Sequence, residues 1–84
     1  MKENKINIEL IVPCIGEKYS VFIPVNKTVG EVIAILNKTI KEMEESFPES
    51  NKNCLINTID GVIYQYDVEV IKSGIKNGSI LALL

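Results

Sequence analysis

The sequence contains no histidine, no arginine and no tryptophan among its 84 residues. Without histidine, it lacks the usual general base of enzymes and the commonest protein ligand of metal ions. Without arginine, it has no side chain that holds phosphate or base edges through paired hydrogen bonds, and its net charge of −2 opposes binding to a polyanion. We therefore expect neither an enzyme nor a nucleic-acid-binding protein.

Cysteine is scarce too, with two residues, Cys14 and Cys54, that are far apart and form no Cys-x-x-Cys motif. Two cysteines without histidine supply neither a catalytic pair nor a complete zinc or iron–sulfur ligand set. No apolar run approaches the roughly 20 residues of a membrane span, and the N-terminus has no signal-peptide pattern. We predict a cytoplasmic protein with reduced thiols, no cofactor, no metal and no membrane insertion, although the sequence leaves a disulfide open.

The composition is that of a small globular protein, with 46% hydrophobic and 24% charged residues. A chain of this length has room for one modest core, so we expect residues 1–84 to form a single domain, with residues 1–5 flexible. Isoleucine and valine dominate the apolar residues, which favours strands.

The N-terminal third predicts a hairpin. From Ile6 to Val12 apolar residues alternate, with Ile11 on the less apolar side, and from Tyr19 to Val25 they alternate again, with Phe22 on the other side. The residues between Pro13 and Glu17 read as a turn. Pro24 cannot donate a ladder hydrogen bond, so we expect the second strand at a sheet edge.

A helix follows. Thr28 and Glu31 match a capping box, and an apolar stripe then recurs at spacings of three and four. The stripe consists of Val29, Val32, Ile33, Leu36, Ile40, Met43 and Phe47, and Pro48 predicts a stop near Phe47. The polar residues 48–53 read as a loop. Glutamates on the outer face of the helix could be taken for a catalytic acid pair, but without a partner group they indicate a solvated face.

The second half predicts short strands. Cys54–Ile59 reads as a third strand with unclear side-chain phase, Asp60-Gly61 as a hairpin turn, and Val62–Tyr66 as a short returning strand. Residues 67–75 then cross over with weak structure, anchored by Val70 and Ile75. The nearly continuous apolar run Ser79–Leu84 predicts a last strand buried inside the sheet.

This order, ββαββ, predicts an α+β fold of the β-grasp kind: a mixed sheet with one helix packed across it, the first and last strands parallel, and the C-terminal strand central. The spacing of Gly61, Val70 and Ser73-Gly74-Ile75-x-Asn77-Gly78-Ser79-x-Leu81-x-Leu83 resembles the ending of ubiquitin-like proteins. More narrowly, the chain resembles the YukD/EsaB-like bacterial ubiquitin-like proteins. That resemblance implies a C-terminal strand between the first and third strands, and a cytoplasmic accessory role with type VII (WXG100 or ESAT-6-like) secretion.

The sequence departs from conjugated ubiquitin and from the ThiS and MoaD sulfur carriers at its end. It stops at Leu81-Ala82-Leu83-Leu84 and not at a flexible Gly-Gly tail, so we expect no conjugation or sulfur transfer. Two alternatives stay open beside the secretion role. One is a generic ubiquitin-like interaction or self-associating module, and the other is a carrier or modifier for an activating enzyme.

The candidate site is a protein-binding surface on the open side of the sheet. If Leu81 and Leu83 face the helix, alternation places other apolar side chains on the opposite face. An apolar patch on an open sheet face often marks a partner site, and this one could also support a homodimer. Scattered surface apolar residues are the competing interpretation. The predicted binding residues are Ile11, Phe22, Ile80, Ala82 and Leu84.

Overall fold

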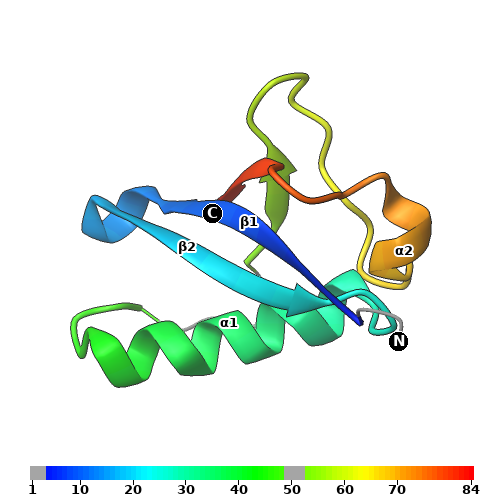
Figure 1. The fold of residues 1–84 in the computed structure, drawn as a ribbon. Coiled ribbons are helices and arrows are strands. Elements are labelled where there is room, and N and C mark those ends of the chain that lie inside the picture. The colour runs from blue at the N-terminus through cyan, green and yellow to red at the C-terminus, as the bar shows by residue number, and fades with distance from the viewer. Residues whose placement is uncertain (1–3, 49–52) are drawn as a thin grey trace.

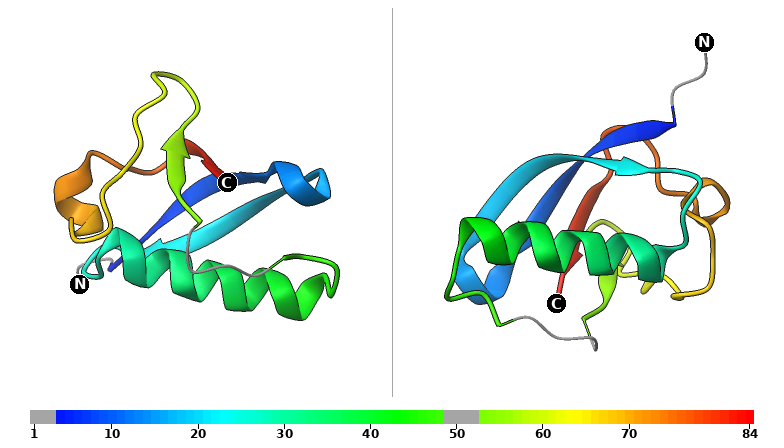
Figure 2. Two further views of the ribbon diagram at one scale, coloured as in Figure 1. Left: turned by 180° about the vertical axis from the view of Figure 1, so that it is seen from behind. Right: turned by 90° about the horizontal axis from the view of Figure 1, so that it is seen from below.

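The computed structural model describes residues 4–48 and 53–84, which form a four-stranded sheet with a long helix across one face (Figures 1 and 2). The strand order is β2-β1-β4-β3, with β4 parallel to β1 and antiparallel to β3. This topology confirms the predicted mixed sheet with the C-terminal strand inside. The strands and the main helix are β1 (Lys5–Val12), β2 (Glu17–Pro24), α1 (Val29–Met43), β3 (Leu55–Asn57) and β4 (Ile80–Leu83).

The N-terminal hairpin pairs along its whole length, from Lys5 opposite Pro24 to Val12 opposite Glu17. A single 3-10 turn, η1 (Pro13–Ile15), joins the two strands, and β2 lies at the sheet edge as predicted. The expected flexibility of residues 1–5 stays a prediction. Lys5 begins β1, and the carbonyl of Asn4 accepts a 2.8 Å hydrogen bond from the Val25 amide. Residues 1–3 lie outside the described residues.

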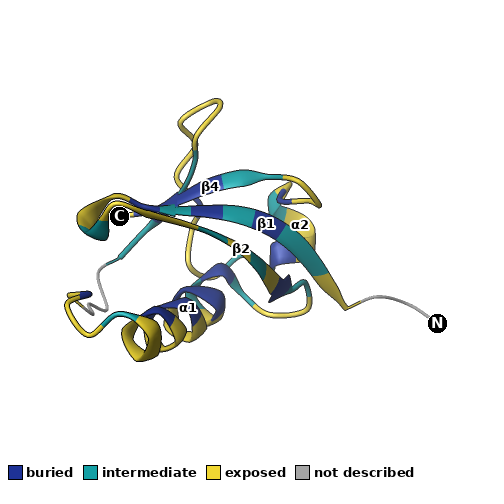
Figure 3. Cartoon of the chain, turned by 60° about the vertical axis from the view of Figure 1, so that its left-hand side comes forward, coloured by how far each residue is buried: buried dark blue, intermediate teal, exposed yellow. Residues whose placement is uncertain are grey.

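The core lies between the sheet and α1. Alternate residues of β1 are buried, as are Leu81–Leu83 of β4, and one stripe of α1 is buried toward the sheet (Figure 3). Each fully buried aliphatic side chain contributes roughly 1.5–3 kcal/mol, so this two-layer contact supplies most of the drive to fold. Its central members are Ile8, Leu10, Val12, Val32, Leu36, Ile40, Leu81 and Leu83.

The start of α1 confirms the predicted capping box. The Glu31 amide donates to the Thr28 hydroxyl at 3.2 Å, and the Thr28 amide donates to the Glu31 carboxylate at 2.9 Å. These bonds satisfy amides that have no partner inside the helix. The backbone hydrogen bond from Thr28, followed by the one from its hydroxyl, lowers the pKa of Glu31 from its ordinary value of 4.5, and the Lys27 charge adds to the effect.

The predicted end of the helix is wrong. The helix stops at Met43, because Glu44 takes an extended backbone conformation and the chain turns back. The turn brings Phe47 into the core, where it is 1% exposed, whereas Met43, a predicted member of the apolar stripe, is 56% exposed. The Lys41 ammonium holds the turn by donating to the carbonyl of Glu45 at 2.6 Å and to that of Phe47 at 3.3 Å. Of the predicted loop 48–53, residues 49–52 lie outside the described residues.

The predicted second hairpin is also wrong in detail. β3 covers only Leu55–Asn57, and the expected returning strand is reduced to an isolated bridge between Ile56 and Ile63. A two-residue type I′ turn needs positive φ at both central residues, but of Asp60-Gly61 only the glycine has it. The loop is wider because the Asn57 side-chain oxygen accepts the Ile59 amide at 2.8 Å and the Asn57 carbonyl accepts the Gly61 amide at 2.9 Å.

The crossover after the bridge returns the chain to the start of α1. It contains one helical turn, α2 (Val70–Ser73), and the buried Val70 and Ile75 confirm the predicted anchors. The Gly30 amide donates to the Tyr66 carbonyl at 2.9 Å, and a β-carbon at Gly30 would lie 3.2 Å from that carbonyl oxygen. Glycine therefore allows the crossover to approach the helix closely.

Candidate functional site

We call the sheet face opposite α1 the open face. It carries a row of four apolar residues: one from each of the neighbouring strands β1, β4 and β3, and a fourth that forms an isolated bridge to β3. Ile11 of β1 is opposite Ala82 of β4, Ala82 is opposite Ile56 of β3, and Ile56 bridges to Ile63. We call these four residues the apolar strip. They face away from the helix because their strand neighbours, such as Leu10 and Leu81, are fully buried on the other side.

Four of the five predicted site residues lie on or beside this strip. Ile11 and Ala82 belong to it, and Ile80 and Leu84 flank Ala82 along the strand direction. Ala82 is only 9% exposed, so it forms the floor, while Ile11 and Ile80 are half-buried and Leu84 is exposed. The structure thus brings these residues together, but their role in binding stays a prediction.

Phe22, the fifth predicted residue, lies on the same face but apart from the strip. It is 70% exposed and stands opposite Asn7. The Asn7 side-chain amide donates to the Ser20 hydroxyl at 3.1 Å and to the Val21 carbonyl at 3.2 Å, while the Asn7 backbone amide donates to Asn77 at 2.8 Å. These hydrogen-bonded polar residues around Asn7 separate the Phe22 ring from the apolar strip. Alternation along one strand could not predict this separation.

Sequence reasoning missed Ile56 and Ile63. Ile56 is half-buried on the open face, and Ile63 is 61% exposed beside it. The third strand is too short for alternation to fix its phase. Its partner provides the missing information, because Ile56 shares the face of Ala82, its opposite residue in β4. The neighbouring loop adds exposed Ile59 and Val62, so apolar surface extends beyond the sheet.

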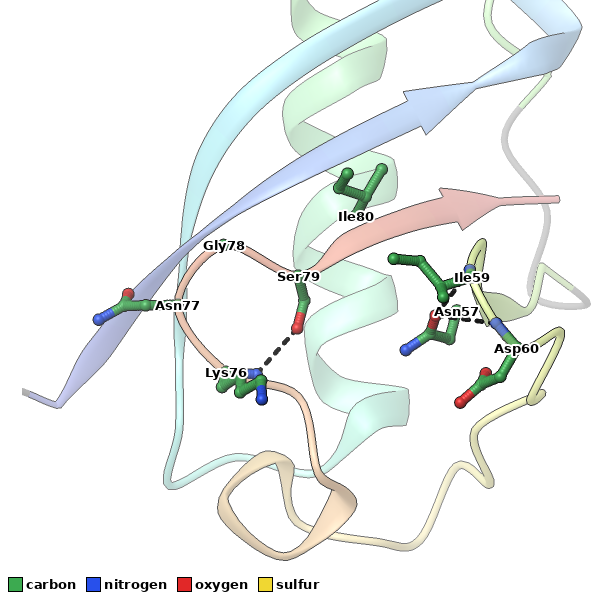
Figure 4. A pocket seen from close by; sticks show the side chains of 8 residues that line it. All are labelled: Asn57, Ile59, Asp60, Lys76, Asn77, Gly78, Ser79 and Ile80. Carbon is green, nitrogen blue, oxygen red and sulfur yellow. Dashed lines mark hydrogen bonds between the residues drawn. The ribbon is translucent and has the colours of Figure 1, made fainter.

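A pocket of about 230 Å³ lies beside Ile80, where the loop after β3 meets the turn before β4 (Figure 4). Side chains from the two segments line it on opposite sides, with Asp60 on one and Lys76 on the other. The turn is held by Ser79, whose hydroxyl accepts the Lys76 amide at 3.0 Å, and Gly78 supplies the positive φ. Its lining residues are Asn57, Ile59, Asp60, Lys76, Asn77, Gly78, Ser79 and Ile80.

The described residues form neither a metal-binding cluster nor a membrane-spanning helix. Within residues 4–48 and 53–84, no three histidine, cysteine, aspartate or glutamate side chains lie close enough to share a metal ion. Over the same ranges, no helix is long and apolar enough to span a bilayer. The open face presents a half-buried apolar surface, and at one end of it lies the pocket that Ile59 and Ile80 line together with polar residues.

Comparison with known proteins identifies the fold. No protein-family model and no curated protein matches the sequence. Among solved structures, the ubiquitin-like domain of the Mycobacterium tuberculosis type VII secretion system protein EccD1 is 12% identical, with a TM-score of 0.73 over 98% of this chain and 99% of that one. A chain of an ESX-5 inner membrane complex is 15% identical, with a TM-score of 0.71 over 98% of this chain and 21% of that one.

A chain of a toluene 4-monooxygenase complex is also similar, at 9% identity, with a TM-score of 0.78 over 94% of this chain and 95% of that one. Because all these identities are low, the likeness shows the fold alone. The chain has the ubiquitin-like α+β fold, and its structural neighbours include domains of type VII secretion components. The narrower resemblance to YukD/EsaB-like proteins stays a prediction.

Proposed function

We propose that this chain is a non-enzymatic ubiquitin-like binding protein of the YukD/EsaB-like kind, acting in the cytoplasm as an accessory component of a type VII secretion system. It binds a protein component of that system through the open face. The observation that carries the proposal is the apolar strip, which crosses three strands on the one sheet face that α1 leaves uncovered.

Two further observations support the proposal. The fold matches domains that occur in type VII secretion proteins, although the same fold also occurs in an oxygenase complex, so the fold alone does not choose the role. The strip is also built on strands, whose backbone hydrogen bonds hold Ile11, Ala82 and Ile56 in fixed positions. A preorganised surface loses little conformational freedom when a partner covers it.

The test is affinity purification of the tagged chain from cells that express it natively, with quantitative mass spectrometry. We expect a type VII secretion component to co-purify with the wild-type chain. The double variant Ile80→Ser/Ile56→Ser removes two half-buried side chains from the open face and should lower recovery at least tenfold, since each aliphatic side chain contributes about 1 kcal/mol or more to such an interface.

Ile35→Ser is the matched control. Ile35 is an exposed isoleucine of α1, which packs against the opposite face of the sheet, so the same chemical change there should leave recovery unchanged. Equal recovery with the double variant and the wild type would contradict the assignment of the open face. Co-purification with proteins unrelated to secretion, lost in the double variant, would retain the binding surface but contradict the secretion role.

A further inference from the structure

One charged residue, Glu9, lies at the centre of the open face. Its neighbours in β1, Ile8 and Leu10, are fully buried toward α1, so alternation places the Glu9 side chain on the opposite face. It stands opposite Ser20 of β2 and opposite Ile80 of β4. Glu9 therefore lies two residues before Ile11, the member of the apolar strip in β1, and it is half-buried.

The Glu9 carboxylate has no intramolecular partner in the part of the chain that the structure describes. In residues 4–48 and 53–84, the one ion pair joins Lys72 to Glu69 at 3.3 Å, and no hydrogen bond reaches the Glu9 carboxylate. Lys18, opposite Ile11 at the edge of the same face, lies one diagonal step away and makes no ion pair with it. Among the described residues, none neutralises the Glu9 charge, so solvation by water is its expected state in the free protein.

A partner that covers Ile80 and the apolar strip removes much of that water from Glu9. Leaving a carboxylate desolvated and unpaired opposes binding, whereas a cation placed against it both compensates the lost hydration and fixes the orientation of the partner. The face therefore discriminates against a purely apolar partner and favours one with a basic side chain among apolar ones.

We propose that Glu9 is the specificity-determining residue of this face, and that the partner inserts a lysine or arginine against it while neighbouring aliphatic side chains cover the apolar strip. This inference rests on the proposed binding role of the open face. It defines the partner segment by its chemistry: one basic residue flanked by aliphatic residues, and no acidic residue at the position that meets Glu9.

A phage-displayed library of random peptides, panned against the chain of residues 1–84, tests the inference without knowledge of the natural partner. We expect the selected peptides to contain a lysine or arginine next to aliphatic residues. A synthetic peptide of the selected sequence should bind Glu9→Gln at least tenfold more weakly than the wild type. Glu42→Gln, the same change on the exposed face of α1, is the matched control and should not alter binding.

Replacing the basic residue of the peptide with methionine should weaken binding to the wild type by a similar factor. The same replacement should cause little further loss in Glu9→Gln, because the two groups act as one pair. Because glutamine has nearly the shape of glutamate, loss of the fold does not explain the result, and circular dichroism of the variant should match that of the wild type.

The outcomes distinguish the proposed role of Glu9 from the proposed role of the open face. Peptides that need Ile80 and Ile56 but bind Glu9→Gln as well as the wild type would overturn the role of Glu9 and leave the open face as the binding site. Peptides whose binding survives Ile80→Ser/Ile56→Ser would overturn the proposed face itself. A micromolar homodimer in analytical ultracentrifugation that Lys18→Gln dissociates would overturn the inference too, since a second copy would then supply the cation.

Discussion

Replacing Leu81 with alanine should destabilise the protein far more than replacing its neighbour Ile80. Leu81 is fully buried in the central strand, between Leu10 and Asn57, and faces α1. Truncating such a side chain leaves a cavity and costs about 2–5 kcal/mol. Ile80 is half-buried on the open face. Three aliphatic carbons at about 0.8 kcal/mol each, roughly half of them already hydrated, give a cost of about 1 kcal/mol.

Urea unfolding followed by circular dichroism measures both values on the same footing. An 84-residue domain has a total stability of roughly 4–12 kcal/mol, so Leu81→Ala should remove a large part of it and Ile80→Ala little. Equal losses for the two variants, or a larger loss for Ile80→Ala, would refute the assignment of Leu81 to the core and Ile80 to the open face. That assignment underlies every statement about the binding surface.

Three further predictions concern the start of α1. Thr28→Ala removes the N-cap and should lower the unfolding free energy by about 1 kcal/mol in urea titrations. Because hydrogen bonds from Thr28 lower the pKa of folded Glu31, its stabilising contribution should be complete above pH 4.5 and fade as the pH falls through the lowered value. Glu31→Gln should flatten that part of the stability curve, and an unchanged curve would contradict the capping contribution. Gly30→Ala should lower the melting temperature, because the added β-carbon would lie 3.2–3.3 Å from atoms of Tyr66. We expect the free-energy cost of this crowding to exceed the roughly 1 kcal/mol gained in helix propensity. A higher melting temperature would contradict this.

Sequence patterns predicted the regular parts of this fold because each of those parts is determined by local chemistry. Alternation over Ile6–Val12 determines which side chains meet the helix, and the Thr28–Glu31 capping box determines where the helix begins. The inside position of the last strand followed from its unbroken apolar run, which needs cover on both faces.

The errors occur where a single side chain next to a loop determines the path of the backbone. Phe47 continues the apolar stripe in the sequence, yet it reaches the core through a turn that Lys41 stabilises. Asn57 bonds to the loop that follows it and so prevents the tight Asp60-Gly61 turn.

The candidate site was only partly predictable for a related reason. Ile11, Ile80, Ala82 and Leu84 follow from alternation within long or central strands. Ile56 required knowledge of its partner strand, and the separation of Phe22 required knowledge of the polar group around Asn7. A surface that spans several strands depends on register, which a single sequence specifies weakly in short strands.

Site-specific photo-crosslinking in living cells tests the binding role of the open face most directly. A photoreactive amino acid replaces Ile80 in one strain and, as the matched control, Ile35 in another. We expect irradiation to join position 80, and not position 35, to a protein component of a type VII secretion system. Crosslinks of that component to position 35 alone, or to both positions equally, would contradict the account.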